Sequence, residues 1–367
     1  MLTRGLPLLL ILAVAGWSGC SGSAPQSRDD PRHARDGPQQ RLHVAGNELV
    51  DAQGQPIRLL GVNRSGAEYS CVAPPDQHLG VFAGPTGERA VAAMTRWGIN
   101  AVRIPLNEHC WLGIQGAPAH YTSAHYRAAI ETYVARLQRA GLYVVLDLHW
   151  NAPGTASSTE QQPMADLDYA PAFWSSVAQT FKDNTGVVFD LYNEPNDISW
   201  RCWRDGCMLP QGWRTAGMQT LVDAVRSTGA RQPLIATGPS WGSDLSSWLR
   251  YRPRDPAGQL MAGIHLFDFA GCSEPDCWTG TLAPVARAVP VVATELGQRD
   301  CSSDYIERFM SWADSSRISY LGWSWNTAGC GAPSLIRSWS GKPTSSGVRF
   351  RDHLTRTASA AMRFHAS

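Results

Sequence analysis

The amino-acid sequence predicts an α/β protein, a single (β/α)8 TIM barrel that follows a short N-terminal β-hairpin. The chain has 367 residues, of which 43% are hydrophobic and 17% charged, enough to bury one large core. Eight short apolar segments alternate with amphipathic helical patterns, with no linker-like break between them. An open, doubly wound sheet is the competing fold, but no GxGxxG or P-loop motif follows a strand. Eight units in one run favour the closed barrel.

The elements are assigned from hydrophobic periodicity. The barrel strands are predicted at residues 57–63, 99–104, 142–149, 186–192, 233–237, 260–267, 291–295 and 318–325. The clearest helices are predicted at residues 88–97, 126–140, 171–181, 212–227 and 305–313. The barrel domain is expected to span residues 42–360, with a tail at 361–367.

The first 41 residues have the pattern of an export signal and a tether. Arg4 precedes an apolar stretch at residues 6–15 that is too short to span a bilayer, so residues 1–20 are interpreted as a signal peptide. Its end, "AGWSGC", resembles the lipobox of bacterial lipoproteins, in which Cys20 becomes lipidated, although Trp17 stands where an aliphatic residue is usual. Residues 21–41 are polar and predict a flexible tether. The expected product is an outer-membrane or cell-surface lipoprotein, with a secreted or periplasmic protein as the alternative.

The remaining eight cysteines predict disulfide bonds, because their number is even and the protein is expected to be exported. All of them follow predicted strands, so disulfides would brace the loops at one end of the barrel. Proximity of the loops favours the pairs Cys71–Cys110, Cys202–Cys207, Cys272–Cys277 and Cys301–Cys330. Zinc binding is the alternative for paired cysteines, but the sequence has no CxxC motif.

Charge and aromatic content indicate a neutral, sugar-like partner. The net charge is +1 and the Lys and Arg residues are scattered, which does not indicate a nucleic-acid partner or a membrane contact other than an anchor at Cys20. Fifteen tryptophans supply flat apolar rings that suit the faces of sugars, although each could equally pack in the core. A monomer is expected.

Polar and aromatic residues occur where the predicted strands end. The C-terminal ends of the strands form the active site in barrels of this kind. The residues placed there are Arg103, His149, Asn193, Glu194, His265, Glu295 and Trp323.

Two of these residues are glutamates at the ends of buried strands. Glu194 ends "GVVFDLYNEP" and Glu295 ends "VPVVATELG". Burying a carboxylate in such a position costs free energy, so its presence there suggests a function. Glycosidic bonds are cleaved by two carboxyl groups, which lie ~5–5.5 Å apart in retaining enzymes. Alternatively, each glutamate could cap the following helix or pair with an arginine.

The ordered set of motifs resembles glycoside hydrolase family 5, the cellulase-containing family of a clan of retaining barrels. The motifs are "NAVRIP", "LDLHW", "NEP", "TELG" and "WSW", and the resemblance covers roughly residues 42–355. It implies the following roles: Glu194 as acid/base, Glu295 as nucleophile, Asn193 as the donor to the sugar 2-hydroxyl, Arg103 as the cation beside the nucleophile, His149 and His265 as imidazoles lining the subsite of the cleaved sugar, and Trp323 as its aromatic floor. It implies neither a cofactor nor a metal.

One position departs from the family pattern. The family usually has His-x-Tyr at the end of the sixth strand, with the tyrosine hydroxyl bonded to the nucleophile, whereas this chain reads "HLFDF" and places Phe267 there. Loss of that donor should raise the pKa of Glu295 and weaken catalysis. The resemblance implies a β-glucan hydrolase, an endo-β-1,4-glucanase in the first instance. Mannan, mixed-linkage or β-1,3-glucan hydrolysis and a non-catalytic, carbohydrate-binding relative are the alternatives.

Further loop residues could contact sugar or pack loops together. They are Glu68, Tyr69, Asn107, Glu108, Trp111, Trp150, Trp241 and Trp278. Asp147 shares a strand face with His149 and is expected to orient polar groups of the barrel.

Overall fold

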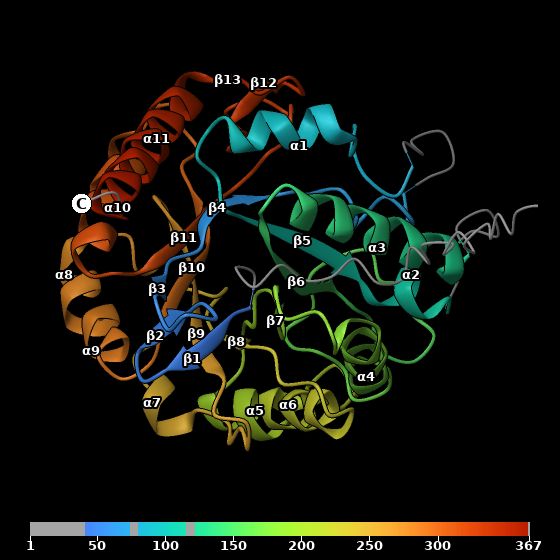
Figure 1. The fold of residues 1–367 in the computed structure, drawn as a ribbon. Helices are drawn as coiled ribbons and strands as arrows, with labels where there is room; N and C mark the ends of the chain where they lie inside the picture. Colours follow the sequence, from blue (N-terminus) through green and yellow to red (C-terminus); the bar gives the residue numbers. More distant parts are fainter. Residues whose placement is uncertain (1–40, 74–79, 115–121, 366–367) are drawn as a thin grey trace, which may run out of the picture. The chain divides into compact units, whose positions relative to one another are not determined.

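The computed structural model describes residues 41–73, 80–114 and 122–365, and its main feature is a closed barrel of eight parallel strands (Figure 1). The barrel strands are β4 (Leu60–Asn63), β5 (Ala101–Asn107), β6 (Tyr143–Trp150), β7 (Val187–Asp190), β8 (Leu234–Thr237), β9 (Leu260–Phe267), β10 (Val291–Gly297) and β11 (Ser319–Gly322). They follow chain order around the barrel, and β11 closes it by pairing with β4. The predicted fold class is therefore confirmed. The expected signal peptide, Cys20 and all but the last residue of the tether lie outside the described residues.

Helices surround the strands (Figure 1). They are α1 (Glu88–Thr95), α2 (Glu108–Leu112), α3 (Ser123–Arg139), α4 (Ala170–Phe181), α5 (Trp200–Asp205), α6 (Gly217–Ser227), α7 (Trp248–Tyr251), α8 (Pro275–Cys277), α9 (Ala283–Ala286), α10 (Asp304–Ser315) and α11 (Ser345–His365), with a π-helical turn at Trp278–Leu282 before α9. Among the helices that the structure describes, none is both long and apolar enough to cross a membrane.

The N-terminal end of the barrel is covered by three short strands, where the sequence predicts only a hairpin. The strands are β1 (His43–Ala45), β2 (Glu48–Val50) and β3 (Pro56–Ile57). Strands β1 and β2 form the hairpin and β3 adds to β2, so Ile57 pairs with Leu49 instead of starting the first barrel strand. Leu42 and Leu49 pack with the first residues of the barrel strands in a separate apolar cluster. Since this cluster fills one end, the other end is left for a site.

The barrel strands are buried on both faces, which explains their nearly continuous apolar sequences. Every residue of β5 and of β9 is buried. The larger core lies between the strands and the helices; α4, for example, buries Phe173 and Trp174 in it. Polar side chains within the barrel are therefore exceptions that require partners, and Arg103 in β5 is the most conspicuous.

Four disulfides join loops that follow the C-terminal ends of the strands. The pairs are Cys71–Cys110, Cys202–Cys207, Cys272–Cys277 and Cys301–Cys330, as predicted. Two of them close short loops of sequence separation 5, and two connect the segments after neighbouring strands. These cross-links hold the end of the barrel at which the predicted site residues lie.

Three differences from the predicted elements concern short or terminal segments. Helices α2 and α5 have only five and six residues, too few for an amphipathic period to be recognised. Helix α11 continues to His365, so residues 361–365 extend that helix instead of forming a tail. Strand β11 ends at Gly322, so Trp323 follows the strand instead of lying within it.

Candidate active site

The C-terminal end of the barrel brings the predicted site residues together. Arg103 projects from β5, His149 from β6, His265 and Phe267 from β9, and Glu295 from β10, while Asn193 and Glu194 follow β7 and Trp323 follows β11. Beyond β7 the backbone stays attached to its neighbours, because Leu191 N donates to Ile235 O and Asn193 N to Leu148 O. This extension carries Asn193 and Glu194 into the barrel mouth.

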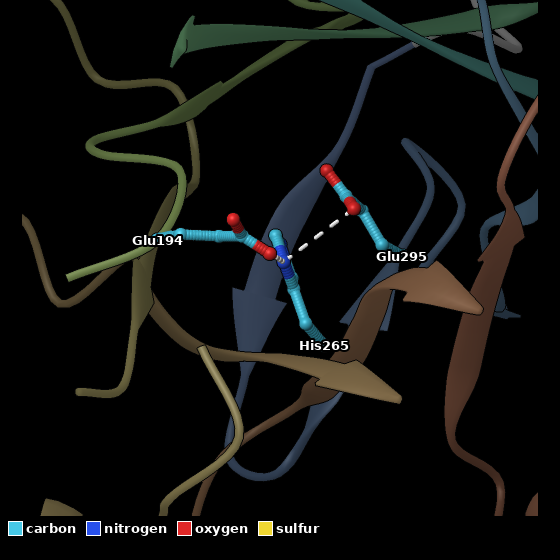
Figure 2. Close-up of side chains that lie close together, drawn as sticks. All are labelled: Glu194, His265 and Glu295. Atoms are coloured by element: carbon cyan, nitrogen blue, oxygen red, sulfur yellow. Dashed lines mark hydrogen bonds and ion pairs between the residues drawn. The ribbon is translucent and has the colours of Figure 1, made fainter. Parts of the chain in front are cut away.

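The two glutamates lie close together on either side of His265 (Figure 2). Atoms of Glu194, His265 and Glu295 all lie within 4.8 Å of one another, one carboxylate oxygen from each glutamate included. His265 Nδ1 is 2.9 Å from Glu194 Oε1 and 3.6 Å from Glu295 Oε2. The register of β9 and β10 explains this, since His265 pairs with Glu295. This proximity resembles the ~5–5.5 Å separation of the carboxyl groups in retaining enzymes more than the ~6.5–9.5 Å of inverting enzymes.

Arg103 connects the nucleophile candidate to its surroundings. Its guanidinium is completely buried and donates to Glu295 Oε1 (2.8 Å) and to Asn193 Oδ1 (2.9 Å). It also contacts Asp190 Oδ2 at 2.9 Å and Asp147 Oδ2 at 3.0 Å. A guanidinium has five N–H donors in a fixed fork, so it can orient all these groups at once. Arg103 therefore holds Glu295 and Asn193 in fixed positions.

His149 is held by contacts on both its nitrogens and its face. Its Nδ1 lies 2.6 Å from Asp147 Oδ2, which favours a proton on Nδ1 and leaves Nε2 as an acceptor. Asn193 Nδ2 lies 3.4 Å from that Nε2. The ring is parallel to Trp323, with an interplanar angle of 5° and centroids 5.7 Å apart. The expected orienting role of Asp147 agrees with these contacts.

Burial dominates the ionisation of the site. It raises the pKa of both Glu194 and Glu295 above the ordinary range of a glutamate, while the charges of nearby residues offset part of the shift. Burial also lowers the pKa of His265 to about 4, so this imidazole is neutral near pH 7. Of the two glutamates, Glu295 is the one that accepts a hydrogen bond from Arg103, so we assign the first ionisation of the pair to Glu295 and the retained proton to Glu194.

Phe267 lies at the end of β9 and packs against β10. It pairs with Gly297, and a β-carbon at Gly297 would come within 2.5 Å of its ring. Its outer face stacks on Phe269, with centroids 5.2 Å apart, and Arg299 covers Phe269 at 3.5 Å. The ring therefore fills its position tightly, and it offers no hydrogen bond to Glu295.

The other loop residues divide into exposed and buried groups. Trp241 is 52% exposed and Tyr69 36% exposed, and the ring of Tyr69 lies 6.3 Å from that of Trp150. Trp241 lies near Glu194, because its backbone N–H donates to the backbone oxygen of Pro195, the next residue after Glu194. These three rings can meet a ligand. The remaining residues are buried and pack loops: Glu68, Asn107, Glu108, Trp111 and Trp278.

Asp190 and Gln161 are two site residues that were not identified from the sequence. Asp190 ends β7 and pairs with Arg103, and a charged residue at the end of an otherwise apolar strand could have indicated this. Gln161 lies in the loop between β6 and α4 and contacts Asn193 Nδ2 through its Oε1 at 2.9 Å. No periodicity or motif marks it, because a loop position depends on the whole fold.

Glu194, His265 and Glu295 are also the group with metal-ligand geometry in the described part of the chain. A transition-metal ion bound there would occupy both carboxylates.

Comparison with known proteins gives the family. The family model described as Cellulase (glycosyl hydrolase family 5) matches residues 50–329 of the chain. The chain belongs to glycosyl hydrolase family 5. The matched range contains every predicted site residue, from Arg103 to Trp323.

Relatives of this family 5 chain include glucanases and mannanases. The endoglucanase MaCel5A of Microbulbifer is 24% identical over 322 residues, which cover 80% of this chain and 54% of the relative, so the chain spans about half the length of that protein. A mannan endo-1,4-β-mannosidase of Salipaludibacillus agaradhaerens is 22% identical over 82% of this chain and 87% of the relative. The crystal structure of β-glucanase SdGluc5_26A from Saccharophagus degradans has the same fold, with a TM-score of 0.68, 19% identity and coverage of 90% of this chain and 98% of that chain.

Proposed function

We propose that the protein is a retaining hydrolase of β-linked glucan, acting as an endo-β-1,4-glucanase. The observation that carries this proposal is the approach of the Glu194 and Glu295 carboxylates to within 4.8 Å at the mouth of the barrel. Two carboxyl groups at this separation suit a double displacement through a covalent glycosyl-enzyme. Family membership and the contacts of Arg103 with Glu295 support the same reaction.

In the first step, Glu295 would attack the anomeric carbon while Glu194 gives its proton to the departing glycosidic oxygen. The carbon–oxygen bond to the leaving sugar breaks as the ester to Glu295 forms. In the second step, Glu194, now ionised, takes a proton from a water molecule that attacks the same carbon and displaces Glu295. The product has the original anomeric configuration, and both glutamates return to their starting states.

The environment of each glutamate suits its proposed role. Burial alone would keep Glu295 protonated, but the hydrogen bond and charge of Arg103 favour the ionised form needed for attack. Glu194 has a side chain that is 22% exposed, so a leaving group and a water can reach it. Burial raises its pKa, which keeps the proton available near neutral pH.

The choice of β-glucan rests on the relatives. Several are named endoglucanases, and the β-glucanase SdGluc5_26A has also been crystallised with cellotetraose. Mannan is the second candidate, because relatives named mannan endo-1,4-β-mannosidase match over a similar share of the chain. A hydrolysis screen with cellulose, mixed-linkage glucan, β-1,3-glucan and mannan separates these substrates.

The mechanism is tested by Glu295→Gln and Glu194→Gln, with Glu160→Gln as control because Glu160 is an exposed residue of a neighbouring loop. Each active-site change should lower turnover on unactivated glucan by about 10²–10⁴ or more, whereas the control should not. Azide should rescue a variant at Glu194 on an activated substrate and give a β-glycosyl azide. Near-native turnover by either active-site variant would contradict the roles assigned to Glu194 and Glu295. If the native protein binds oligosaccharides without hydrolysing them, it is a non-catalytic relative.

We further propose that the protein is exported and anchored through a lipid on Cys20. The support is the sequence pattern of residues 1–20, together with disulfides that need an oxidising compartment. The membrane would then be a partner only through this anchor, and the substrate would be an extracellular or periplasmic polysaccharide.

A further inference from the structure

One glutamine outside the barrel strands contacts three consecutive residues of the site. Gln161 Nε2 donates to Tyr192 Oη at 2.9 Å and to the backbone oxygen of Glu194 at 3.2 Å. Its Oε1 accepts from Asn193 Nδ2 at 2.9 Å. The loop between β6 and α4 is thus joined to the end of β7 through a single amide group.

The direction of these hydrogen bonds is fixed by Arg103. A guanidinium can only donate, so the Asn193 amide must turn Oδ1 toward Arg103 and Nδ2 away from it. Gln161 must then present Oε1 to Asn193, which directs Nε2 to the backbone oxygen of Glu194, an atom that can only accept. Neither amide can be reversed without placing two donors or two acceptors face to face. The orientation of Asn193 is therefore determined from both ends.

This arrangement leaves one hydrogen of Asn193 for a ligand. The Asn193 amide has two hydrogens on Nδ2, and Gln161 takes one of them at 2.9 Å. The other faces His149 Nε2 at 3.4 Å, which is long for a hydrogen bond. A sugar hydroxyl could replace this long contact at little cost, whereas the short bond to Gln161 would stay in place.

We infer that Gln161 is a positioning residue that aims the free N–H of Asn193 at the C2 hydroxyl of the sugar whose glycosidic bond is cleaved. The inference rests on the proposed function, in which that contact strengthens in the transition state. Without Gln161 the Asn193 amide would be held only through Oδ1, by Arg103, and its Nδ2 could rotate away from the sugar. Gln161 should consequently affect turnover more than ground-state binding.

The test compares Gln161→Leu with Gln162→Leu on two substrates. Gln162 is the matched control, since its backbone oxygen accepts from Tyr192 Oη while its side chain makes no hydrogen bond to another residue that the structure describes. The substrates are an aryl β-cellobioside and its analogue that lacks the C2 hydroxyl on the sugar next to the aryl group. For Gln161→Leu we expect kcat to fall about ten- to a hundredfold on the first substrate, with little change in KM, and less than about threefold on the second.

The ratio of the two rates is independent of how much protein is folded, because both substrates meet the same preparation. An equal loss on both substrates, or no loss on either, would overturn the inference while leaving the proposed function intact. Failure of the wild-type protein to hydrolyse any β-glycan would overturn the proposed function, and this inference with it.

A second variant gives an independent readout. Gln161→Glu keeps an acceptor for Asn193 but replaces the donor to the backbone oxygen of Glu194 by a carboxylate oxygen, so it should retain more of the rate difference between the two substrates than Gln161→Leu does. The added negative charge should also raise the pKa of Glu194 and move the alkaline limb of the pH–rate profile upward. An alkaline limb that stays in place, together with a lost rate difference, would show that Gln161 acts only through packing.

Discussion

Arg103 Nη1 donates a hydrogen bond to Glu295 Oε1 across 2.8 Å, and solvent reaches none of the guanidinium. Arg103→Lys should raise the pKa of Glu295, because an ammonium cannot reproduce the fork that faces Glu295 and Asn193 together. Since Glu295 must be ionised to attack, a raised pKa moves the acidic limb of kcat/KM to higher pH, by about one unit, and lowers the maximum about a hundredfold. Arg89→Lys, at an exposed position of α1, should change neither. If the acidic limb of the pH–rate profile does not shift in Arg103→Lys, Arg103 does not have the electrostatic role assigned to it.

Phe267 provides a second pH prediction. A tyrosine hydroxyl there could donate to Glu295, stabilise the carboxylate and lower its pKa, so Phe267→Tyr should move the acidic limb of the pH–rate profile downward or raise turnover. Phe269→Tyr is the matched control, because that ring lies on the outer side of Phe267 and is 52% exposed. A loss of activity in Phe267→Tyr would instead mean that the tight packing against Gly297 leaves no space for the hydroxyl.

The disulfides should contribute unequally to stability. In the chain-entropy account, a cross-link stabilises more when it closes a longer loop. Replacing both Cys71 and Cys110 by serine, at a sequence separation of 39, should lower the free energy of unfolding by about 3–4 kcal/mol and reduce Tm. The same change at Cys272 and Cys277, at a separation of 5, should cost less. Equal losses of unfolding free energy would show that burial of the sulfur atoms outweighs loop closure. Peptide mapping of the unreduced protein verifies the four pairs.

Anchoring is tested at Cys20. Cys20→Ser should release the protein from membranes with unchanged specific activity, because the predicted tether separates the anchor from the barrel. Detergent partitioning of the native protein and the variant measures this directly. Firm attachment requires more than one acyl chain, as a bacterial lipoprotein would have. Native protein found only in the aqueous phase would indicate ordinary secretion and would explain Trp17 in the lipobox-like segment.

Much of the fold could be predicted because barrel strands are short, buried runs separated by amphipathic helices. The positions of Glu194 and Glu295 followed from the same pattern, since a strand end marks the mouth of the barrel. The disulfide between Cys301 and Cys330 could also be predicted, because loops after neighbouring strands lie side by side. These features depend on order along the chain and on general topology.

What could not be predicted depends on contacts between distant loops. Gln161 and Asn193 are 32 residues apart, and nothing in the local sequence at Gln161 indicates that its amide meets the end of β7. The third strand at Pro56–Ile57 was missed because its apolar residues continue into those of β4. The sequence also does not determine that Trp241 is exposed and Trp111 is buried, because a tryptophan that follows a strand can take either environment.

The small sheet of β1, β2 and β3 has a consequence for how the protein could be immobilised. The chain enters the barrel at Leu42, within the apolar cluster at the end opposite Glu194 and Glu295. Material coupled ahead of Leu42, whether a bead, an electrode or a fusion partner, is therefore attached at the end of the barrel remote from Glu194 and Glu295. A dense layer of molecules immobilised in this way should turn these glutamates outward, and long polymer chains could reach them without passing between neighbouring molecules.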